Sequence, residues 1–366
     1  MIRLAKPYIP EKVYEDIKAI LESGHLIQGK FVKRFEEELA KYLNIPYVKV
    51  VSSGTAALHL SLMAMGIEPG DEVIVPAFSF PATANVVEVI GATPVFVDIN
   101  LSDYCINTSL IEEKTTHKTK AIIPVHEFGQ PCDMDQTFQI AQKYKLKIIE
   151  DAACALGAEY KNQKVGTFGD IGCFSLHPRK AITTGEGGIV VTRNKDLADR
   201  IDMLRNHGIK KIDGKLDFHI AGLNYRMTEF QAAIGLHQLK IIEQLINKRI
   251  EQAKLYRDLL TNSEEVVLQE EFNNRKHIYQ TFHILFKSLN RDLIIKNMQE
   301  KGFETNIGAY AIPYLDYYYN KYNTNAEEYT NAFIAFKQGL SLPIGFHIDI
   351  RDQKRLIKQL ISNLGI

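Results

Sequence analysis

The stretch Val48-Lys49-Val50-Val51-Ser52-Ser53-Gly54-Thr55-Ala56-Ala57-Leu58 joins a β-branched run to a helical pattern through a short polar turn. Valine favours a strand, glycine permits a close turn, and a hydroxyl side chain caps the helix that follows. Similar apolar runs occur at 72–75, 94–98, 121–125, 147–150, 171–175 and 188–192, and helical patterns lie between them at 56–65, 82–89, 134–144 and 195–205. This alternation predicts an α/β fold with a mostly parallel seven-stranded sheet, covered by helices on both faces.

The pattern changes near Thr228. Thr228 and Gln231 have the spacing of a capping box, and the helical pattern that follows continues toward Leu260. We place a domain boundary inside this helix. The sequence then predicts a large domain over residues 1–245 and a smaller α+β domain over residues 246–366, on which the N-terminal segment can also pack. Because ligands bind beyond the carboxyl ends of parallel strands, we look for chemistry in the loops that follow the predicted strands.

Composition narrows the classes of function. The 366 residues include 44 basic and 44 acidic side chains, so no electrostatic footprint for a nucleic acid is expected. No apolar run approaches the ~18 residues of a membrane helix, and the first residues lack the apolar core of a signal peptide. A cytoplasmic protein is therefore predicted. No metal site is expected, and a reduced compartment is indicated, because four cysteines form neither a C-x-x-C pair nor a zinc spacing: Cys105, Cys132, Cys154 and Cys173.

The segment from Gly24 to Phe31 resembles a phosphate-binding P-loop only in part. It ends in Phe31, where magnesium needs a serine or threonine, and it follows a helical pattern (11–21) instead of a strand. The glycine-rich segment 185–188 precedes a strand, whereas a dinucleotide fingerprint follows one. Neither nucleotide hydrolysis nor dinucleotide binding is therefore predicted.

Three polar elements each follow a predicted strand. Gly54 and Thr55 open a helix whose free N–H groups suit a phosphate, although an ordinary helix cap has the same pattern. Asp151 could keep the ring nitrogen of a pyridine cofactor protonated, or it could cap the next helix. Lys180 could form a Schiff base with a carbonyl group, or it could be an ordinary surface lysine. Together the three elements favour a phosphate cradle, a carboxylate and a reactive lysine in one site.

Longer motifs carry a resemblance that covers essentially the whole chain. They are GKFVKRFEE (29–37), VPAFSF (75–80), GQPCD (129–133), FGDIGCFS (168–175), GLNYRM (222–227) and LSLP (340–343). In their order and wording the chain resembles the DegT/DnrJ/EryC1/StrS family, the sugar aminotransferases of pyridoxal-phosphate (PLP) fold type I. The resemblance implies PLP as cofactor, with pyridoxamine phosphate as its second form, and a homodimer with shared active sites.

The same resemblance implies roles for the residues that match the cofactor site. Lys180 would hold PLP as a Schiff base and then act as general base, and Asp151 would pair with the pyridine nitrogen. Phe80 would stack on the cofactor ring. The implied phosphate cradle comprises Gly54, Thr55 and Ser175.

Four further positions follow from the resemblance. Asn224 would reach the cofactor phosphate of the neighbouring subunit. Arg226 suits a substrate pyrophosphate, although a surface position is the alternative. Cys154 stands beside the cofactor ring where relatives often have Gln or His, and Tyr310 lies in a substrate-shaping region where many relatives have a His-Tyr pair.

These inferences predict a ping-pong transamination. Glutamate would give its amino group to PLP and leave as 2-oxoglutarate, and pyridoxamine phosphate would then aminate a keto group of a nucleotide-linked deoxysugar. Such a reaction belongs to the biosynthesis of amino sugars for surface polysaccharides, lipopolysaccharide among them, or natural products. One alternative is a PLP-dependent sugar dehydratase, but those relatives have His in place of Lys180. The other is a non-catalytic ligand-binding or regulatory protein, which would not need both Asp151 and Lys180.

Overall fold

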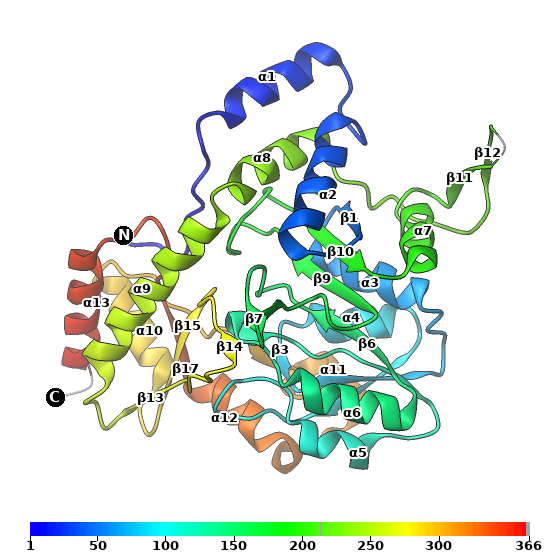
Figure 1. The fold of residues 1–366 in the computed structure, drawn as a ribbon. Coiled ribbons are helices and arrows are strands. Elements are labelled where there is room, and N and C mark those ends of the chain that lie inside the picture. Colours follow the sequence, from blue (N-terminus) through cyan, green and yellow to red (C-terminus); the bar gives the residue numbers. More distant parts are fainter. Residues whose placement is uncertain (213, 364–366) are drawn as a thin grey trace.

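The computed structural model describes residues 1–212 and 214–363, and its central feature is a seven-stranded sheet (Figure 1). In spatial order its strands are β1 (Tyr47–Val51), β10 (Gly188–Thr192), β9 (Ile171–Ser175), β6 (Lys147–Asp151), β5 (Thr119–Ile122), β2 (Glu72–Pro76) and β4 (Thr93–Val97). The five strands from β9 to β4 pair in parallel, and β10 is antiparallel to both of its neighbours. The predicted fold class is therefore confirmed.

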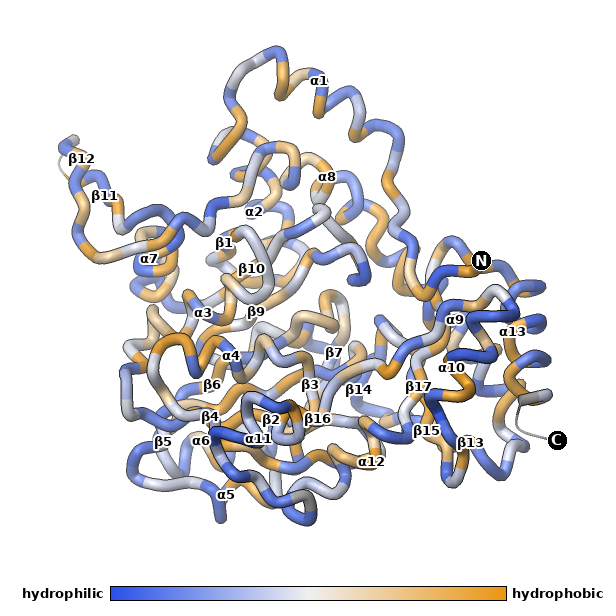
Figure 2. The backbone as a smooth tube through the Cα atoms, turned by 180° about the vertical axis from the view of Figure 1, so that it is seen from behind, coloured by the Kyte–Doolittle hydropathy of each residue, from blue (hydrophilic) through white to orange (hydrophobic). Residues whose placement is uncertain are grey.

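Helices cover both faces of this sheet, because its strands are apolar on both sides. Val48 and Val50 pack with the helices on one face of the sheet, whereas Val51, the next residue along the strand, packs with the helices on the other face. The first face is covered by α2 (Lys30–Leu43), α6 (Met134–Tyr144) and α8 (Glu229–Leu239), and the second by α3 (Gly54–Ala64), α4 (Ala82–Val89) and α7 (Lys195–Leu204). Figure 2 shows the hydrophobic residues concentrated along the strands of the sheet.

Two local expectations differ from the structure. The run 121–125 was expected to be one strand, but β5 ends at Ile122, because Pro124 has no N–H to continue a ladder. The helix after Thr228 was expected to be continuous, but it divides into α8 and α9 (Ile242–Leu260). At the division the N–H of Ile241 bonds to the carbonyl of Gln238, a three-residue turn that redirects the chain. The capping box of Thr228 and Gln231 is present as predicted.

The C-terminal part has a separate core. Strands β13 (Val266–Leu268), β15 (Phe282–Phe286) and β17 (Gly339–Leu342) form an antiparallel sheet against α9, α10 (Arg291–Glu300) and α13 (Ile350–Asn363). The N-terminal segment lies on this part, where Ile2 bridges to Phe303 and the amide of Leu4 donates to Glu304 (Figure 1). A boundary at residue 245 stays a prediction.

The remaining elements are short or peripheral. A hairpin of β11 (Ile209–Ile212) and β12 (Lys215–Phe218) projects beyond α7, and α1 (Val13–Ser23) lies outside α8 (Figure 1). The short pair β3 (Phe78–Ser79) and β16 (Tyr310–Ala311) connects the large sheet to the C-terminal part. Helices α11 (Asp316–Tyr322) and α12 (Thr330–Gln338) follow β16. None of the helices in the described residues has the length and apolar character needed to cross a membrane.

Candidate active site

A cavity of about 510 Å³ lies beyond the carboxyl ends of β1, β2, β5, β6 and β9. This is the edge at which parallel sheets bind ligands, and the volume suits a small phosphorylated cofactor together with part of a substrate. The cavity gathers seven of the residues predicted for the cofactor: Gly54, Thr55, Phe80, Asp151, Cys154, Ser175 and Lys180.

One end of the cavity is the N-terminus of α3. The hydroxyl of Ser53 caps this helix by accepting the N–H of Ala56 at 3.0 Å. The N–H groups of Gly54 and Thr55, in the first turn, have no partner within the helix, so they are available to an anion. Gly54 is required here by a close approach, because a Cβ on it would lie 2.8 Å from the Cβ of Ser175. The cap and the phosphate cradle are therefore compatible uses of the same turn.

Asp151 ends β6 and is buried at the cavity wall. Its Oδ2 accepts the hydroxyl of Thr83 at 2.9 Å, and its Oδ1 accepts the N–H of Ala153 at 3.1 Å. Burial raises the pKa of Asp151, against these two hydrogen bonds and the charge of Lys180, which favour the carboxylate. The alternative in which Asp151 caps a helix is wrong, since residues 152–158 form turns.

The preceding residue, Glu150, has a different task on the other side of the strand. Its carboxylate accepts the N–H groups of Gly166, Phe168 and Gly169, each at 2.7 Å, and it also bonds to His126. Glu150 therefore fixes a loop, and Asp151 alone of this acidic pair faces the cavity.

Lys180 is partly buried and lines the cavity, so it is not an ordinary surface lysine. Its Nζ donates to the Sγ of Cys154 at 3.0 Å. Burial opposes the charge of Lys180, but the hydrogen bond to Cys154 and the nearby carboxylate of Asp151 raise the lysine pKa. Burial also raises the pKa of the Cys154 thiol. The predicted reactive amine is thus held by a direct contact with Cys154.

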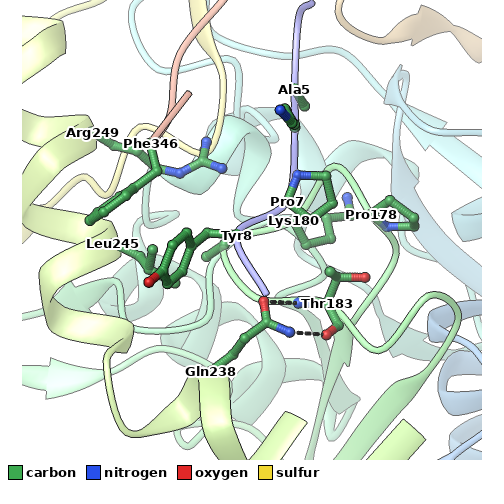
Figure 3. Close-up of a pocket in the computed structure, with 12 residues that line it drawn as sticks. Ala5, Pro7, Tyr8, Pro178, Lys180, Thr183, Gln238, Leu245, Arg249 and Phe346 are labelled. Carbon is green, nitrogen blue, oxygen red and sulfur yellow. Dashed lines mark hydrogen bonds between the residues drawn. The ribbon is translucent and has the colours of Figure 1, made fainter. Parts of the chain in front are cut away.

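The loop that carries Lys180 is supported from behind, as Figure 3 shows. The N–H of Thr183 donates to the side chain of Gln238 at 3.1 Å, and that side chain donates in return to the carbonyl of Thr183. The N-terminal residues Pro7 and Tyr8 cover the same loop and leave a space of only about 20 Å³. This backing allows little room for the lysine loop to move, which favours a defined position of Nζ.

Phe80 lines the cavity, and Tyr310, which is not one of the lining residues, packs beside Phe80. Phe80 is 65% exposed, and its ring centroid is 6.3 Å from that of Tyr310 in an edge arrangement. Pairing of Tyr310 with Ser79 between β16 and β3 fixes their relative positions. An exposed aromatic surface of this kind is available for stacking on a ring.

Asn224 and Arg226 are not among the residues that line the cavity of their own chain. The Nε of Arg226 donates to Asn224 at 3.0 Å, and its Nη1 donates to Asn206 at 2.9 Å. Arg226 also bridges to Val51, which places the segment beside the end of β1. Asn224 is exposed, and its predicted contact with the phosphate of a partner subunit stays a prediction.

Sequence reasoning missed Glu127, a buried acid in the cavity wall that is 4% exposed. It lies just beyond β5, and the position beyond a strand that indicated Asp151 would have indicated Glu127 as well.

Sequence reasoning also missed Glu229, whose carboxylate occupies the P-loop-like segment. Glu229 accepts the N–H groups of Gly29 and Phe31 at 3.0 Å and that of Val32 at 2.9 Å.

The cavity thus combines free helix N–H groups, a buried carboxyl group and a lysine amine. These groups fit the phosphate, the ring nitrogen and the aldehyde carbon of PLP. Fold and site together define an α/β enzyme of the kind that holds PLP at the carboxyl edge of its sheet.

A profile of the DegT/DnrJ/EryC1/StrS aminotransferase family matches residues 7–361, and the chain belongs to this family. It is 38% identical over 323 residues to the GDP-perosamine synthase of Escherichia coli O157:H7, with 88% of each chain covered. It is 33% identical over 380 residues to the UDP-4-amino-4-deoxy-L-arabinose–oxoglutarate aminotransferase of Shewanella sediminis (strain HAW-EB3), which covers 99% of this chain and 98% of the relative. The predicted family is confirmed.

Solved structures agree with this assignment. The PMP-form of Spr1654 from Streptococcus pneumoniae has a TM-score of 0.93 at 28% identity, with 98% of both chains covered. Its PLP-form has the same TM-score and identity, and covers 98% of this chain and 97% of that one. The predictions of an aminotransferase and of PLP as its cofactor are thereby confirmed for the family to which the chain belongs.

Proposed function

We propose that this protein transfers an amino group from glutamate to a keto group of a nucleotide-linked deoxysugar, with PLP as cofactor. One observation carries the proposal: a single cavity contains Lys180, Asp151 and the N-terminus of α3. The names of two relatives support the substrate class, since one acts in the synthesis of a GDP-linked sugar and the other pairs a UDP-linked sugar with oxoglutarate.

Each cavity residue has a defined task in this proposal. Bound PLP supplies an electron sink that stabilises negative charge on a neighbouring carbon. Asp151 keeps the ring nitrogen protonated through its carboxylate, and the amides of Gly54 and Thr55 bind the phosphate. Lys180 carries a proton at Nζ between the reacting carbons. The thiol of Cys154, in contact with Nζ at 3.0 Å, orients the amine for that transfer.

The substrate lies on the open side of the cavity in this proposal. Phe80 stacks on the cofactor ring, and Tyr310 beside it shapes the sugar site. Arg226 binds the pyrophosphate as a charged donor. Asn224 completes the cofactor site of a second subunit, which is consistent with its exposure outside the cavity of its own chain.

A panel of nucleotide keto sugars tests the reaction. Purified protein is incubated with PLP, glutamate and each UDP-, GDP- or dTDP-linked keto sugar, and 2-oxoglutarate and the amino sugar are measured. We expect 2-oxoglutarate in an amount equal to the aminated sugar, for one or a few members of the panel. Lys180→Arg is the control, because it keeps the charge but cannot form the bond to the cofactor. Bound PLP without any amino transfer from glutamate would contradict the proposal.

A mixing experiment tests the shared site. Lys180→Ala and Asn224→Asp chains, each inactive alone, are unfolded together and refolded. If Asn224 acts in the partner, a hybrid dimer has one intact site, so about a quarter of the wild-type activity should return for random pairing. Hybrid dimers that form and stay inactive would contradict a role for Asn224 across the interface.

A further inference from the structure

Glu127 is a buried acid of the cavity without an assigned task. Its side chain comes from the loop after β5 and lines the same cavity as Lys180 and Asp151. Within residues 1–212 and 214–363, no basic side chain forms an ion pair with its carboxyl group within 4.0 Å. A buried carboxylate with so few partners would be costly, whereas a protonated acid would not.

The residues around Glu127 hold its backbone firmly. His126 points away from the cavity, since its Nε2 bonds to Glu150 and its Nδ1 accepts the N–H of Cys132, both at 3.0 Å. These two contacts assign the ring proton of His126 to Nε2. The N–H of His126 also donates to the carbonyl of Asp151 at 3.0 Å. This hydrogen bond attaches the loop that carries Glu127 to the end of β6, where Asp151 lies.

On the other side of Glu127 the backbone is left-handed. Phe128 has a φ of 56°, which is uncommon for an aromatic residue, and Gly129 has a φ of 93°. The ring of Phe128 stacks on His283 with centroids 4.5 Å apart. A Cβ on Gly129 would lie 2.7 Å from a side-chain carbon of Ile278. Strain of this kind persists where the surroundings enforce it and clusters at functional sites. Here it turns the Glu127 side chain into the cavity.

The groups that act on Glu127 decide its protonation. Burial is the largest effect and raises the pKa of Glu127 to about 8, with Asp151 and Cys132 acting in the same direction and Lys180 opposing them. At neutral pH the group is therefore a carboxylic acid, and it can donate a hydrogen bond as well as accept one.

We propose that Glu127 is a neutral acid that donates its proton, as a hydrogen bond, to an oxygen atom of a molecule bound in the cavity. The identity of that molecule rests on the proposed function: the oxygen belongs to the hydroxyl group on the PLP ring or to the keto group of the sugar. Both oxygens gain negative charge that a carboxylate would repel and a carboxylic acid stabilises. Within a cavity shielded from water, such a donor is stronger than it would be in solution.

Infrared difference spectra of the full chain, freed of cofactor, test the protonation directly. Wild type minus Glu127→Gln should show a protonated-carboxyl band at neutral pH that disappears as the pH rises through about 8. Glu186→Gln is the matched control, because Glu186 lines the same cavity but is exposed to solvent. The spectrum of this variant should still contain the protonated-carboxyl band of Glu127. Absence of the band at neutral pH would overturn the proposal. This measurement needs neither PLP nor sugar, so its result does not depend on the proposed function.

Spectra and half-reactions of the PLP-loaded protein distinguish the two oxygens. If the PLP hydroxyl accepts the proton, Glu127→Met, which has no donor, should shift the visible absorption of bound PLP and its pH dependence. Glu127→Gln, whose amide group still donates, should shift them less. If the sugar accepts it, the spectrum should stay constant. The sugar half-reaction should then slow about 100-fold in Glu127→Met, with partial recovery in Glu127→Gln, while the glutamate half-reaction is unchanged. No change in the spectrum or in either half-reaction would overturn the proposal. Circular dichroism confirms that each variant is folded.

Discussion

Two helices of this protein begin next to a glycine, and their N-termini are used in opposite ways. At α2, which resembles a P-loop in sequence, the carboxylate of Glu229 accepts three backbone N–H groups. At α3, which shows a plain Ser-Gly-Thr turn, the N–H groups of Gly54 and Thr55 face a cavity. The first N-terminus is filled by the protein itself, and the second is left available for a ligand.

The difference shows that a free helix N-terminus is defined by what packs against it. Glu229 is 2% exposed and belongs to α8, which lies against α2. Its Oε2 would lie 2.7 Å from a Cβ on Gly29, so this glycine serves a close approach to a carboxylate. Gly54 serves a close approach to Ser175 in the wall of the cavity. The same residue type therefore marks a structural contact in one helix and a binding site in the other.

The largest effect is expected at the α3 end, where Lys180 supplies the reacting amine. Lys180→Ala should abolish amino transfer, because it removes both the attachment point of PLP and the base, while stability changes little. Borohydride should fix PLP covalently to wild-type protein at Lys180, as peptide mapping can show, and not to the variant. Label on another lysine would mean that the cavity was assigned wrongly.

At the α2 end, Glu229→Gln should destabilise the protein by about 3 kcal/mol, because an amide group replaces a buried carboxylate that satisfies three donors. Urea unfolding measures this loss, and PLP affinity of the folded fraction should be near that of wild type. Glu251→Gln, at an exposed position of α9, is a control for the loss of one charge. A Glu229→Gln chain with unchanged stability but weakened PLP binding would reverse the contrast between the two helices.

A smaller effect is expected from Gly54→Ala. The added methyl group meets the Cβ of Ser175 at 2.8 Å, so the turn has to shift by a fraction of an ångström. PLP affinity should fall about 10-fold, since the amides that bind the phosphate move with the turn. Titration of the cofactor-free protein by fluorescence measures the dissociation constant. An affinity equal to wild type would indicate that the phosphate does not lie at α3.

A further effect concerns the pH dependence of stability at Glu127. In the unfolded chain a glutamate has a pKa near 4.3, and in the folded protein burial raises the pKa of Glu127 to about 8. Between these two pKa values the unfolded chain loses the proton more readily than the folded protein does. The free energy of unfolding therefore falls as the pH rises toward about 8. The melting temperature of Glu127→Gln should therefore exceed that of wild type increasingly from acidic to mildly alkaline pH. A difference that does not vary with pH would contradict a raised pKa.

Much of the fold was predictable from the sequence because its elements depend on neighbours along the chain. The strand before Gly54, the helix after it and the capping box of Thr228 arise from side-chain preferences within a few residues. The break between α8 and α9 was not predictable in this way. Neither proline nor glycine marks it, and the chain is redirected at Ile241 by a backbone turn that no local pattern indicates.

The sequence by itself determined the strand–helix alternation, the position of Asp151 and Lys180 beyond their strands, and the family to which the motifs point. Only the tertiary structure decided which groups share a cavity, and which carboxyl groups are bonded to the backbone or kept uncharged by burial. Glu229 closes an N-terminus 200 residues away along the chain, and Glu127 becomes an uncharged acid only when its loop is buried against β6. The physical reason is the separation along the chain over which each effect acts. Periodicity and capping act within a few residues, whereas desolvation and ion contacts depend on segments that meet only in the folded chain.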